Sequence, residues 1–374
     1  MEIIVNTRLL IKNKLDGIGR FSNETLKLIT QQHPEHHFYF LFDRNFDDEF
    51  IFADNITPLV ISPQARHPVL FYLWFEHSVA PLLNKIKPDL FLSPDGYLSL
   101  NSNVKQLPVF HDLNFIHYPN DVPWLVKKYY NYFFPRFAKK ATRIATVSEF
   151  SKTDICKTFD IGFEKIDVVY NGASSIFKPV TDEVKIEIKK KYAGDCDYFL
   201  FVGSLHPRKN IVNLFTAFDT FKNNTNSIFK LIVVGSKYYW TTEMENCYNN
   251  LIHKNDVVFC GRIDDNELAK ITASAYAVTY IPYFEGFGIP IIEAMQCGVP
   301  VITSNVTSMP EIASNAALLV NPLNTNEIAL AMQKIVDDNC CRKQYIEKGI
   351  QRASVFTWQK TADLLWESIE KTIE

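Results

Sequence analysis

The stretch that decides the predicted fold is Pro282-Tyr-Phe-Glu285-Gly286-Phe287-Gly288-Ile289-Pro290-Ile-Ile-Glu293-Ala294. It follows the apolar run Ala277–Ile281, turns on two glycines, and predicts a helix with Pro290 at its first position. Glycines let the backbone approach a ligand closely, and the free N–H groups at a helix start favour a phosphate. The stretch therefore predicts a strand–loop–helix unit whose loop cradles a diphosphate.

The same alternation of short apolar runs and longer amphipathic runs extends along the whole chain and predicts parallel sheets built from βα units. Strands are expected at Ile3–Asn6, Phe38–Phe42, Leu90–Ser93, Leu107–His111, Ile144–Val147, Ile166–Val169, Tyr198–Val202, Phe229–Val234, Val257–Cys260, Ala277–Ile281, Val299–Thr303 and Ala317–Val320. A chain of 374 residues exceeds what one core normally organises, so two domains are expected. We place them at 1–178 and 197–355, with a Lys- and Glu-rich linker over 179–196.

The composition excludes several classes of protein. Hydrophobic residues make up 47% of the chain and the net charge is −3, which is typical of a folded globular protein and gives no electrostatic reason to bind nucleic acid. The seven cysteines contain no C-x-x-C pair, so neither a disulfide framework nor a metal site is predicted. No segment approaches the ~20 apolar residues that span a bilayer. We expect a cytoplasmic protein, either free or at the inner face of the cytoplasmic membrane.

Charged residues follow several of the predicted strands, at the sheet edge where ligands of open α/β sheets bind. Arg208 and Lys209 come soon after Gly203, which ends a strand, and they predict cations that hold a diphosphate. Glu285 lies in the glycine loop and Glu293 in the predicted first helical turn, where both could accept hydrogen bonds from sugar hydroxyls. No Asp-x-Asp metal-binding motif accompanies these residues in the predicted donor site.

The stretch 282–294 resembles the E-x7-E motif of glycosyltransferase family 4, a group of retaining GT-B enzymes, and Gly298-Val299-Pro300 continues it in the family's manner. The resemblance implies two Rossmann-like, doubly wound parallel-sheet domains facing across a cleft. It also implies that Glu285 holds the transferred sugar and Glu293 the ribose hydroxyls. The backbone that would meet sugar and phosphate is that of Gly286, Phe287 and Gly288.

Other segments extend the resemblance over most of the chain. In the family, the Arg-Lys pair that matches Arg208 and Lys209 contacts the diphosphate, and residues at the place of Arg262 and Ile263 line the base pocket. The segment from Phe356 onward resembles the family's last helix, so residues 356–374 are expected to return to the N-terminal domain.

Two N-terminal features also match the family. Gly17 and Gly19 stand at the place of a glycine loop that closes over the donor phosphates, although Asp16 replaces a glycine that many members carry. His111, after a predicted strand, resembles the family's histidine that approaches the transferred sugar; a structural role for it is an equal alternative.

The resemblance implies a retaining, metal-independent hexosyltransferase that uses a GDP- or UDP-linked sugar, mannose-like, and no cofactor. The 1–178 domain would bind a saccharide acceptor and the 197–355 domain the nucleotide sugar. Cations and aromatics interleave over 127–140, which is typical of a helix at an anionic lipid surface and suggests a lipid-linked acceptor in surface polysaccharide assembly. Alternatively, the aromatics of this helix face the core and its lysines face water.

Three other functions stay open. A GT-B nucleotide-sugar epimerase would isomerise its donor without an acceptor, and a catalytically silent protein would only bind nucleotide sugar. A nicotinamide-dependent oxidoreductase fits less well, because Gly17-Ile18-Gly19 lacks the third glycine of G-x-G-x-x-G.

Overall fold

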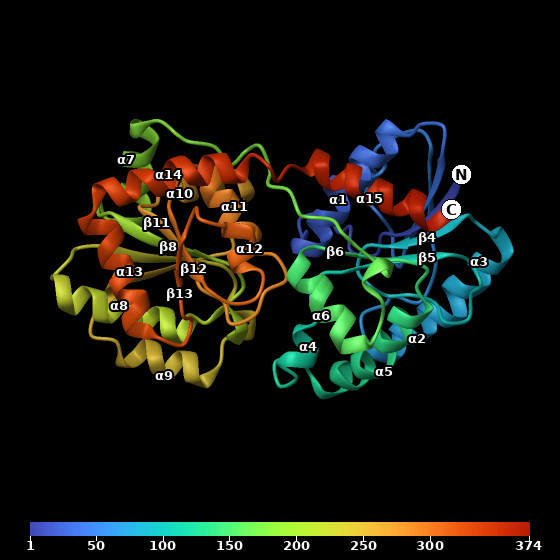
Figure 1. Cartoon of the computed structure of the whole chain (residues 1–374), viewed down its shortest axis with the longest axis horizontal. Coiled ribbons are helices and arrows are strands. Elements are labelled where there is room, and N and C mark those ends of the chain that lie inside the picture. Colours follow the sequence, from blue (N-terminus) through green and yellow to red (C-terminus); the bar gives the residue numbers. More distant parts are fainter. The chain divides into compact units, whose positions relative to one another are not determined.

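The computed structural model describes all 374 residues and divides the chain into two compact units. The first unit comprises Met1–Gly172 and Trp358–Glu374, and the second comprises Ala173–Thr357. Each unit has a parallel sheet covered by helices (Figure 1). The chain therefore passes between the units at 172–173 and again at 357–358.

The segment 179–196 is not the free linker that its charged composition suggested. Most of it is helix α7 (Asp182–Ala193), which packs on α10 (Asp265–Ser274) of the second unit. Glu267 of α10 accepts hydrogen bonds from Lys191 at 2.6 Å and from the Tyr192 hydroxyl at 2.9 Å. The charged residues that suggested a linker thus lie on the solvent-facing side of α7.

The sheet of the first unit has seven parallel strands in the order β3-β2-β1-β4-β5-β6-β7. Six of them lie within a few residues of the predicted positions, and β3 was not predicted. The strands are β1 (Glu2–Asn6), β2 (His37–Phe42), β3 (Ile56–Val60), β4 (Leu90–Ser93), β5 (Gln106–Phe110), β6 (Ile144–Thr146) and β7 (Ile166–Val168). The strand order reverses between β1 and β4, and this switch point is where ligands bind in doubly wound sheets.

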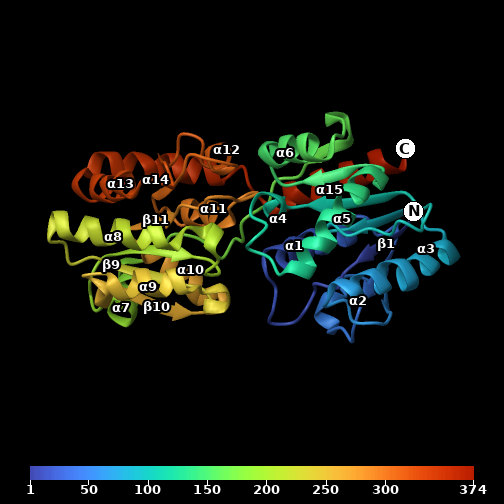
Figure 2. The same cartoon turned by 90° about the horizontal axis from the view of Figure 1, so that it is seen from below.

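Two hydrophobic cores cover the two faces of this sheet, because alternate residues of each strand point to opposite faces. Ile3 and Val5 pack in the core beneath α1 and α15, whereas Ile4 packs in the core beneath α3 and α5. The helices are α1 (Gly17–Gln32), α2 (Pro68–Leu73), α3 (Ala80–Ile86), α4 (Asn114–His117), α5 (Trp124–Lys140), α6 (Glu149–Phe159) and α15 (Trp358–Ile373), with a π-helical segment at Trp74–Val79 and 3₁₀ turns at Asp48–Phe50 and Phe163–Lys165. The last helix, α15, runs beside α1 (Figures 1 and 2).

The second unit repeats the architecture with six parallel strands in the order β10-β9-β8-β11-β12-β13, and all six were predicted to within two residues. Its switch point lies between β8 and β11. The strands are β8 (Tyr198–Val202), β9 (Lys230–Val234), β10 (Val257–Gly261), β11 (Ala277–Tyr280), β12 (Val301–Ser304) and β13 (Leu318–Val320). Besides α7 and α10, the helices are α8 (Ile211–Thr225), α9 (Thr242–Asn250), α11 (Ile289–Gln296), α12 (Met309–Ala313), α13 (Thr325–Asp337) and α14 (Asn339–Ala353), with 3₁₀ turns at Pro207–Lys209, Lys237–Tyr239 and Lys254–Asp256.

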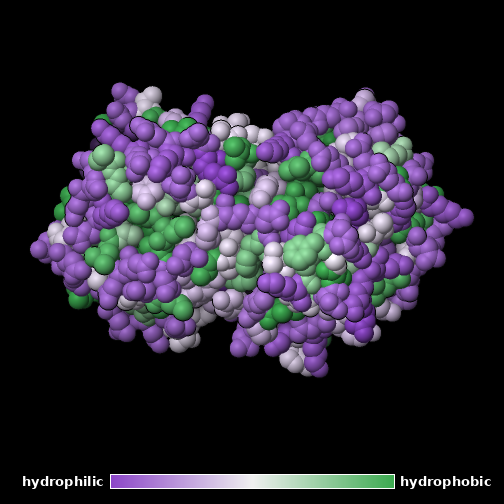
Figure 3. All heavy atoms as spheres, viewed as in Figure 1, coloured by the Kyte–Doolittle hydropathy of each residue, from purple (hydrophilic) through white to green (hydrophobic).

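The surface of the protein has no continuous apolar band on the face seen in Figure 3, where hydrophobic residues form separate groups among hydrophilic ones. None of the helices combines the length and the apolar character that a bilayer crossing requires.

Candidate functional site

The switch point of the second sheet brings together two loops that are far apart in sequence. Strands β8 and β11 are neighbours, with Phe199 paired to Ala277 and Leu200 to Val278. The loop after β8 carries Arg208 and Lys209, and the loop after β11 carries Glu285. Both loops leave the carboxyl edge of the sheet, so their side chains meet at the place where a ligand is expected.

The turn that carries the two cations is fixed by its own side chains. His206 caps the 3₁₀ turn Pro207–Lys209, and its Nδ1 accepts the backbone N–H of Arg208 at 3.3 Å. Asn210 closes the turn in the left-handed region, at φ 62°, a conformation that Asn tolerates better than most residues. Its side-chain amide donates to the Pro322 carbonyl at 2.7 Å. These contacts therefore fix the backbone that carries Arg208 and Lys209.

Both cations converge on one oxygen of Glu285. Arg208 donates to Glu285 Oε2 at 2.5 Å and to the Phe284 carbonyl at 3.1 Å. The Lys209 ammonium contacts the same carboxylate oxygen and also donates to the Tyr280 hydroxyl at 2.5 Å. Lys209 is 7% exposed, so this is a largely desolvated cluster of two cations and one anion.

The charge state of Glu285 follows from this cluster. Burial on its own would raise the pKa of the carboxyl group, but the adjacent charges of Arg208 and Lys209 lower that pKa to about 2. Glu285 is therefore ionised at neutral pH, and the cluster carries a net charge of +1. An arriving anion would find one uncompensated positive charge and two cations already oriented.

The glycine loop leads into α11, which begins at Ile289, so Pro290 is its second residue and not its first as predicted. Gly288 precedes the helix at φ 91°, a left-handed conformation that favours glycine, and a Cβ there would meet the flexible end of the Met309 side chain at 2.8 Å. The side chain of Phe287 packs edge-to-face on Phe356 at 5.7 Å, and Gly286 is also buried. Because no acidic residue occupies the first turn of α11, the N–H groups at its start are not neutralised by an acid on the helix itself.

Glu293 does not lie in the first turn of the helix, as the sequence had suggested. The helix begins at Ile289, which makes Glu293 its fifth residue and the start of the second turn. Its side chain is buried, at 7% exposure. A buried carboxylate one turn from the loop suits a fixed acceptor of hydrogen bonds better than a surface acid.

In the loop after β12, sequence reasoning missed Ser308, which contacts this site, and its neighbour Thr307. Ser308 Oγ donates to the backbone carbonyl of Glu285 at 2.8 Å and so holds the loop. Thr307 has φ 57°, which is strained for a β-branched residue, and its buried hydroxyl has no hydrogen-bond partner. Such strain is typical of a binding site, and the signal in the sequence is the polar run before the helix at Met309.

The carboxyl ends of β8, β9 and β10 form a close-packed edge of glycines. Gly235 N–H donates to the Gly261 carbonyl at 2.8 Å, and a Cβ on Gly235 would lie 1.8 Å from the Gly203 carbonyl oxygen. Only glycine fits at that position. Arg262 and Ile263 follow directly and begin the loop to α10, so the predicted base-pocket residues lie at this same edge.

In the first unit, Gly17 and Gly19 form the start of α1. Asp16 caps this helix, and its carboxylate accepts the Gly19 N–H at 2.9 Å. A Cβ on Gly19 would lie 3.0 Å from the Leu9 carbonyl, whereas Gly17 is exposed with open space around it. The departure from the family pattern at Asp16 thus supplies a helix cap, and it leaves Gly17 as the accessible glycine.

His111 lies just after β5, and its ring stands edge-to-face to Phe21 at 5.1 Å. Its Nε2 donates to the Pro94 carbonyl at 2.8 Å. Burial lowers the pKa of His111, so the ring is neutral at physiological pH and Nδ1 carries the acceptor lone pair. The residue can accept a hydrogen bond from a hydroxyl group.

A buried ion pair at the switch point of the first sheet was not predicted. Arg8, two residues after β1, donates to Asp95 at 2.6 Å and lies over the Tyr97 ring at 4.5 Å. Asn6 donates to the other oxygen of Asp95 at 2.7 Å. The sequence signal for this ion pair was the position of Arg8 just after the first strand. Its partner Asp95 lies 87 residues further along the chain, so the pair itself could not be read from local sequence.

Two family models and several known proteins match the sequence of this chain. The model of "Glycosyl transferases group 1" matches residues 183–352, and that of "Glycosyltransferase Family 4" matches residues 16–175. The chain is 27% identical to O-antigen chain mannosyltransferase B of Escherichia coli over 96% of this chain and 97% of that protein. It is 32% identical to O-antigen chain mannosyltransferase RfbU of Salmonella typhimurium over 57% of this chain and 55% of that protein.

Solved structures share the fold at low sequence identity. A glycosyltransferase from Rickettsia africae has a TM-score of 0.75 at 17% identity, covering 100% of this chain and 98% of that one. Anabaena Alr3699/HepE in complex with UDP-glucose has a TM-score of 0.73 at 17% identity, with 99% and 100% covered. The two sheets and the cation–glutamate cluster at the second switch point therefore define a glycosyltransferase of the GT-B class. The chain belongs to glycosyltransferase family 4.

Proposed function

We propose that this glycosyltransferase moves a mannose-like hexose from a GDP- or UDP-linked donor to a saccharide acceptor, with retention of configuration and without a divalent metal. The observation that carries the proposal is the cluster of Arg208, Lys209 and Glu285 at the second switch point. The curated relatives that are named mannosyltransferases of O-antigen chains support mannose as the sugar and surface polysaccharide as the product.

The cations would stabilise the leaving group. Cleavage of the bond between sugar and diphosphate places negative charge on the departing phosphate oxygen, and fixed cations in a desolvated site stabilise that charge strongly. Hydrogen bonds to the Phe284 carbonyl and the Tyr280 hydroxyl orient Arg208 and Lys209. As the diphosphate takes over part of their charge, the Glu285 carboxylate becomes available to sugar hydroxyls. The same carboxylate thus keeps the cations in place in the free protein and orients the sugar in the complex.

Retention would follow from attack on the face that the diphosphate leaves. The departing phosphate oxygen then accepts the proton of the incoming hydroxyl, so no enzymic nucleophile or base is required at the reacting carbon. In this scheme His111 accepts a hydrogen bond from the sugar, and Glu293 from the ribose. The backbone of the glycine loop and the start of α11 meet the phosphates.

A donor panel with a defined acceptor tests the proposal. Purified protein would be incubated in EDTA with nucleotide-linked mannose or glucose and a synthetic lipid-linked mannosyl saccharide. We expect α-linked mannose in the product, as read by NMR of the anomeric proton. Isomerised donor in the absence of acceptor would favour the epimerase instead, and binding without turnover would favour a silent sugar-binding protein.

We also propose that the acceptor is lipid-linked and that α5 contacts the membrane. The aromatic residues of α5 are divided: Phe134 and Phe137 are buried, whereas Trp124 and Tyr132 are 66% and 54% exposed. Part of the aromatic side chains of this helix therefore lies in the core, and part is exposed. Tyr132 lines a groove of about 480 Å³ between α2 and α5, with Val69 and Tyr72 on the α2 side.

Cations accompany the exposed aromatics of α5. The Lys128 ammonium lies 4.0 Å from the Trp124 ring, and the Arg136 guanidinium lies 3.6 Å from the Tyr132 ring. Aromatic rings with adjacent cations suit the interface of an anionic bilayer, where each Lys or Arg contributes about 1 kcal/mol. This pairing is the reason to propose an anionic lipid surface rather than a neutral one.

Vesicle co-sedimentation checks the membrane contact. We expect the protein to pellet with phosphatidylglycerol vesicles at low salt and to be released at about 1 M salt, where the Debye length is only ~3 Å. Trp124→Ser with Lys128→Gln should weaken binding at least about tenfold, since it removes one aromatic anchor and one charge. The matched control is Lys343→Gln with Lys348→Gln on α14 of the second unit. If the protein pelleted equally with neutral vesicles, the proposed contact between α5 and an anionic membrane would be wrong.

A further inference from the structure

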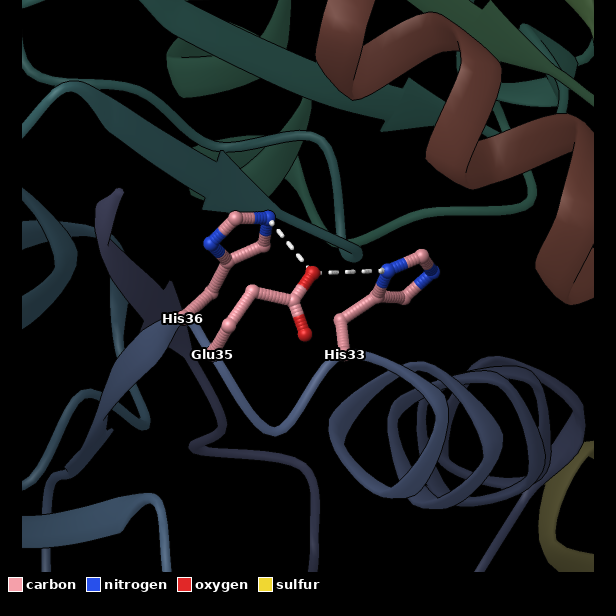
Figure 4. Close-up of side chains that lie close together, drawn as sticks. All are labelled: His33, Glu35 and His36. Carbon is pink, nitrogen blue, oxygen red and sulfur yellow. Dashed lines mark ion pairs between the residues drawn. The ribbon is translucent and has the colours of Figure 1, made fainter.

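The turn between α1 and β2 carries three metal-binding side chains within four residues. His33 follows the last residue of α1, Glu35 and His36 lie in the turn, and β2 begins at the next residue (Figure 4). The carboxylate of Glu35 lies between the two imidazole rings. The segment contains neither a cysteine pair nor an Asp-x-Asp motif, so its His-x-Glu-His pattern was not predicted as a metal site.

The spacing of the three groups matches the coordination shell of a zinc-class ion. Glu35 Oε1 lies 3.7 Å from His33 Nδ1 and 3.3 Å from His36 Nε2. An ion with bonds of about 2.05 Å in tetrahedral geometry places its ligand atoms about 3.4 Å apart. All three ligand atoms lie within 4.8 Å of one another, so a single ion could reach them after small side-chain rotations.

The two imidazole rings are held in place from another part of the chain. Trp366 of α15 stacks on His33 with 3.6 Å between ring centroids and on His36 with 5.2 Å, and the ring planes are nearly parallel. The indole N–H of Trp366 donates to Glu370 at 3.0 Å, which fixes the indole. Rings that are already oriented lose less conformational entropy when they bind an ion.

The second nitrogen of His36 has its own partner. Nδ1 lies 3.2 Å from the amino nitrogen of Met1. This contact holds the ring on one side, while Nε2 on the other side faces Glu35.

We propose that His33, Glu35 and His36 bind one divalent transition-metal ion of the zinc class, with a water molecule in the fourth position. Two imidazoles and one carboxylate are ligands that zinc accepts, and the exposed side of Glu35 gives the ion access. The site belongs to the first unit and shares no residue with the Arg208–Lys209–Glu285 cluster. Because Trp366 stacks on both ligands, the ion would strengthen the packing of α15 on the turn after α1 rather than take part in transfer.

Metal titration of the full chain tests the proposal. Protein freed of metal with EDTA and desalted would be titrated with zinc chloride by calorimetry. We expect one saturable site per chain and a melting temperature that rises with zinc concentration, because an ion that binds only the folded state stabilises it. His33→Gln with His36→Gln should weaken zinc binding at least about 100-fold, and Glu35→Gln about tenfold. His77→Gln, which removes an exposed histidine of the same unit, should leave binding unchanged.

A spectroscopic measurement locates the ion. Cobalt(II) at this site should give the intense visible absorption of tetrahedral coordination and quench tryptophan fluorescence, and Trp366→Phe should remove most of that quenching. Circular dichroism without metal would show that each variant folds. Zinc binding that survives loss of both histidines, or the absence of any saturable binding, would overturn the proposal. Either result leaves the proposed transferase function untouched, because donor turnover in EDTA is measured separately.

Discussion

Replacing Glu285 by Gln is expected to lower kcat/KM for sugar transfer at least about 100-fold, while the affinity for the nucleoside diphosphate stays the same or rises. Glutamine keeps the size of the side chain but loses the charge that both cations contact. Loss of one preorganised hydrogen-bonding group from an active site costs about 2.7–4 kcal/mol of transition-state stabilisation, which is a factor of ~10²–10³. The diphosphate, in contrast, would no longer compete with a carboxylate for Arg208 and Lys209.

The two effects are separable by experiment. Steady-state kinetics with a saturating acceptor gives kcat/KM for the donor, and calorimetry gives the Kd of the nucleoside diphosphate. Glu347→Gln on α14 is the matched control, because it removes an exposed carboxylate of the same unit. If the Glu285→Gln protein kept full transfer activity, the role assigned to Glu285 in sugar transfer would be wrong.

Replacing Lys209 by Met should weaken donor binding by about the same factor by which Glu285→Gln lowers kcat/KM. The ammonium is buried and contacts both Glu285 and Tyr280, so it cannot be replaced by a neighbouring surface lysine. We expect the Kd of the nucleoside diphosphate to rise about 100-fold and kcat/KM to fall further, because the missing cation matters most when charge develops on the leaving group. Removal of one partner of a buried ion pair also lowers the free energy of unfolding, by about 3 kcal/mol.

A double variant distinguishes lost stability from lost function. Lys209→Met together with Glu285→Gln removes the ammonium and its carboxylate at the same time, while Arg208 keeps the Phe284 carbonyl as a partner, so part of the lost stability should return, as measured by urea unfolding. Donor binding should not return. If the double variant regained the affinity for nucleoside diphosphate, the lysine would act only through folding, and its assignment to the diphosphate would be wrong.

Much of the fold was predictable because its signals are local. The composition of runs such as Tyr198–Val202 and Ala277–Ile281 is enough to predict strands. Gly288 followed by Pro290 predicts the start of a helix. The strand β3 was missed because Ile56–Val60 is short, contains a proline and lies at the edge of the sheet. The 179–196 segment was mistaken for a linker because a helix exposed on one side resembles a charged loop.

The contacts of the site depend on strand order, which a single sequence does not contain. Arg208 and Glu285 are 77 residues apart, and they meet only because β11 lies next to β8. The family resemblance identified both residues without predicting that they pair in the free protein. Arg8 and Asp95 meet in the same way at the other switch point, and no motif pointed to them. The cluster at His33, by contrast, is contiguous in sequence and was open to prediction from ligand spacing alone.

Calorimetric titration of a nucleoside diphosphate into EDTA-treated protein tests the central claim most directly. Two fixed cations that replace a metal should give measurable affinity in EDTA, unchanged by added Mg²⁺ and lost in Arg208→Gln with Lys209→Met. Affinity that appears only with Mg²⁺, or that survives in the double variant, would contradict the account.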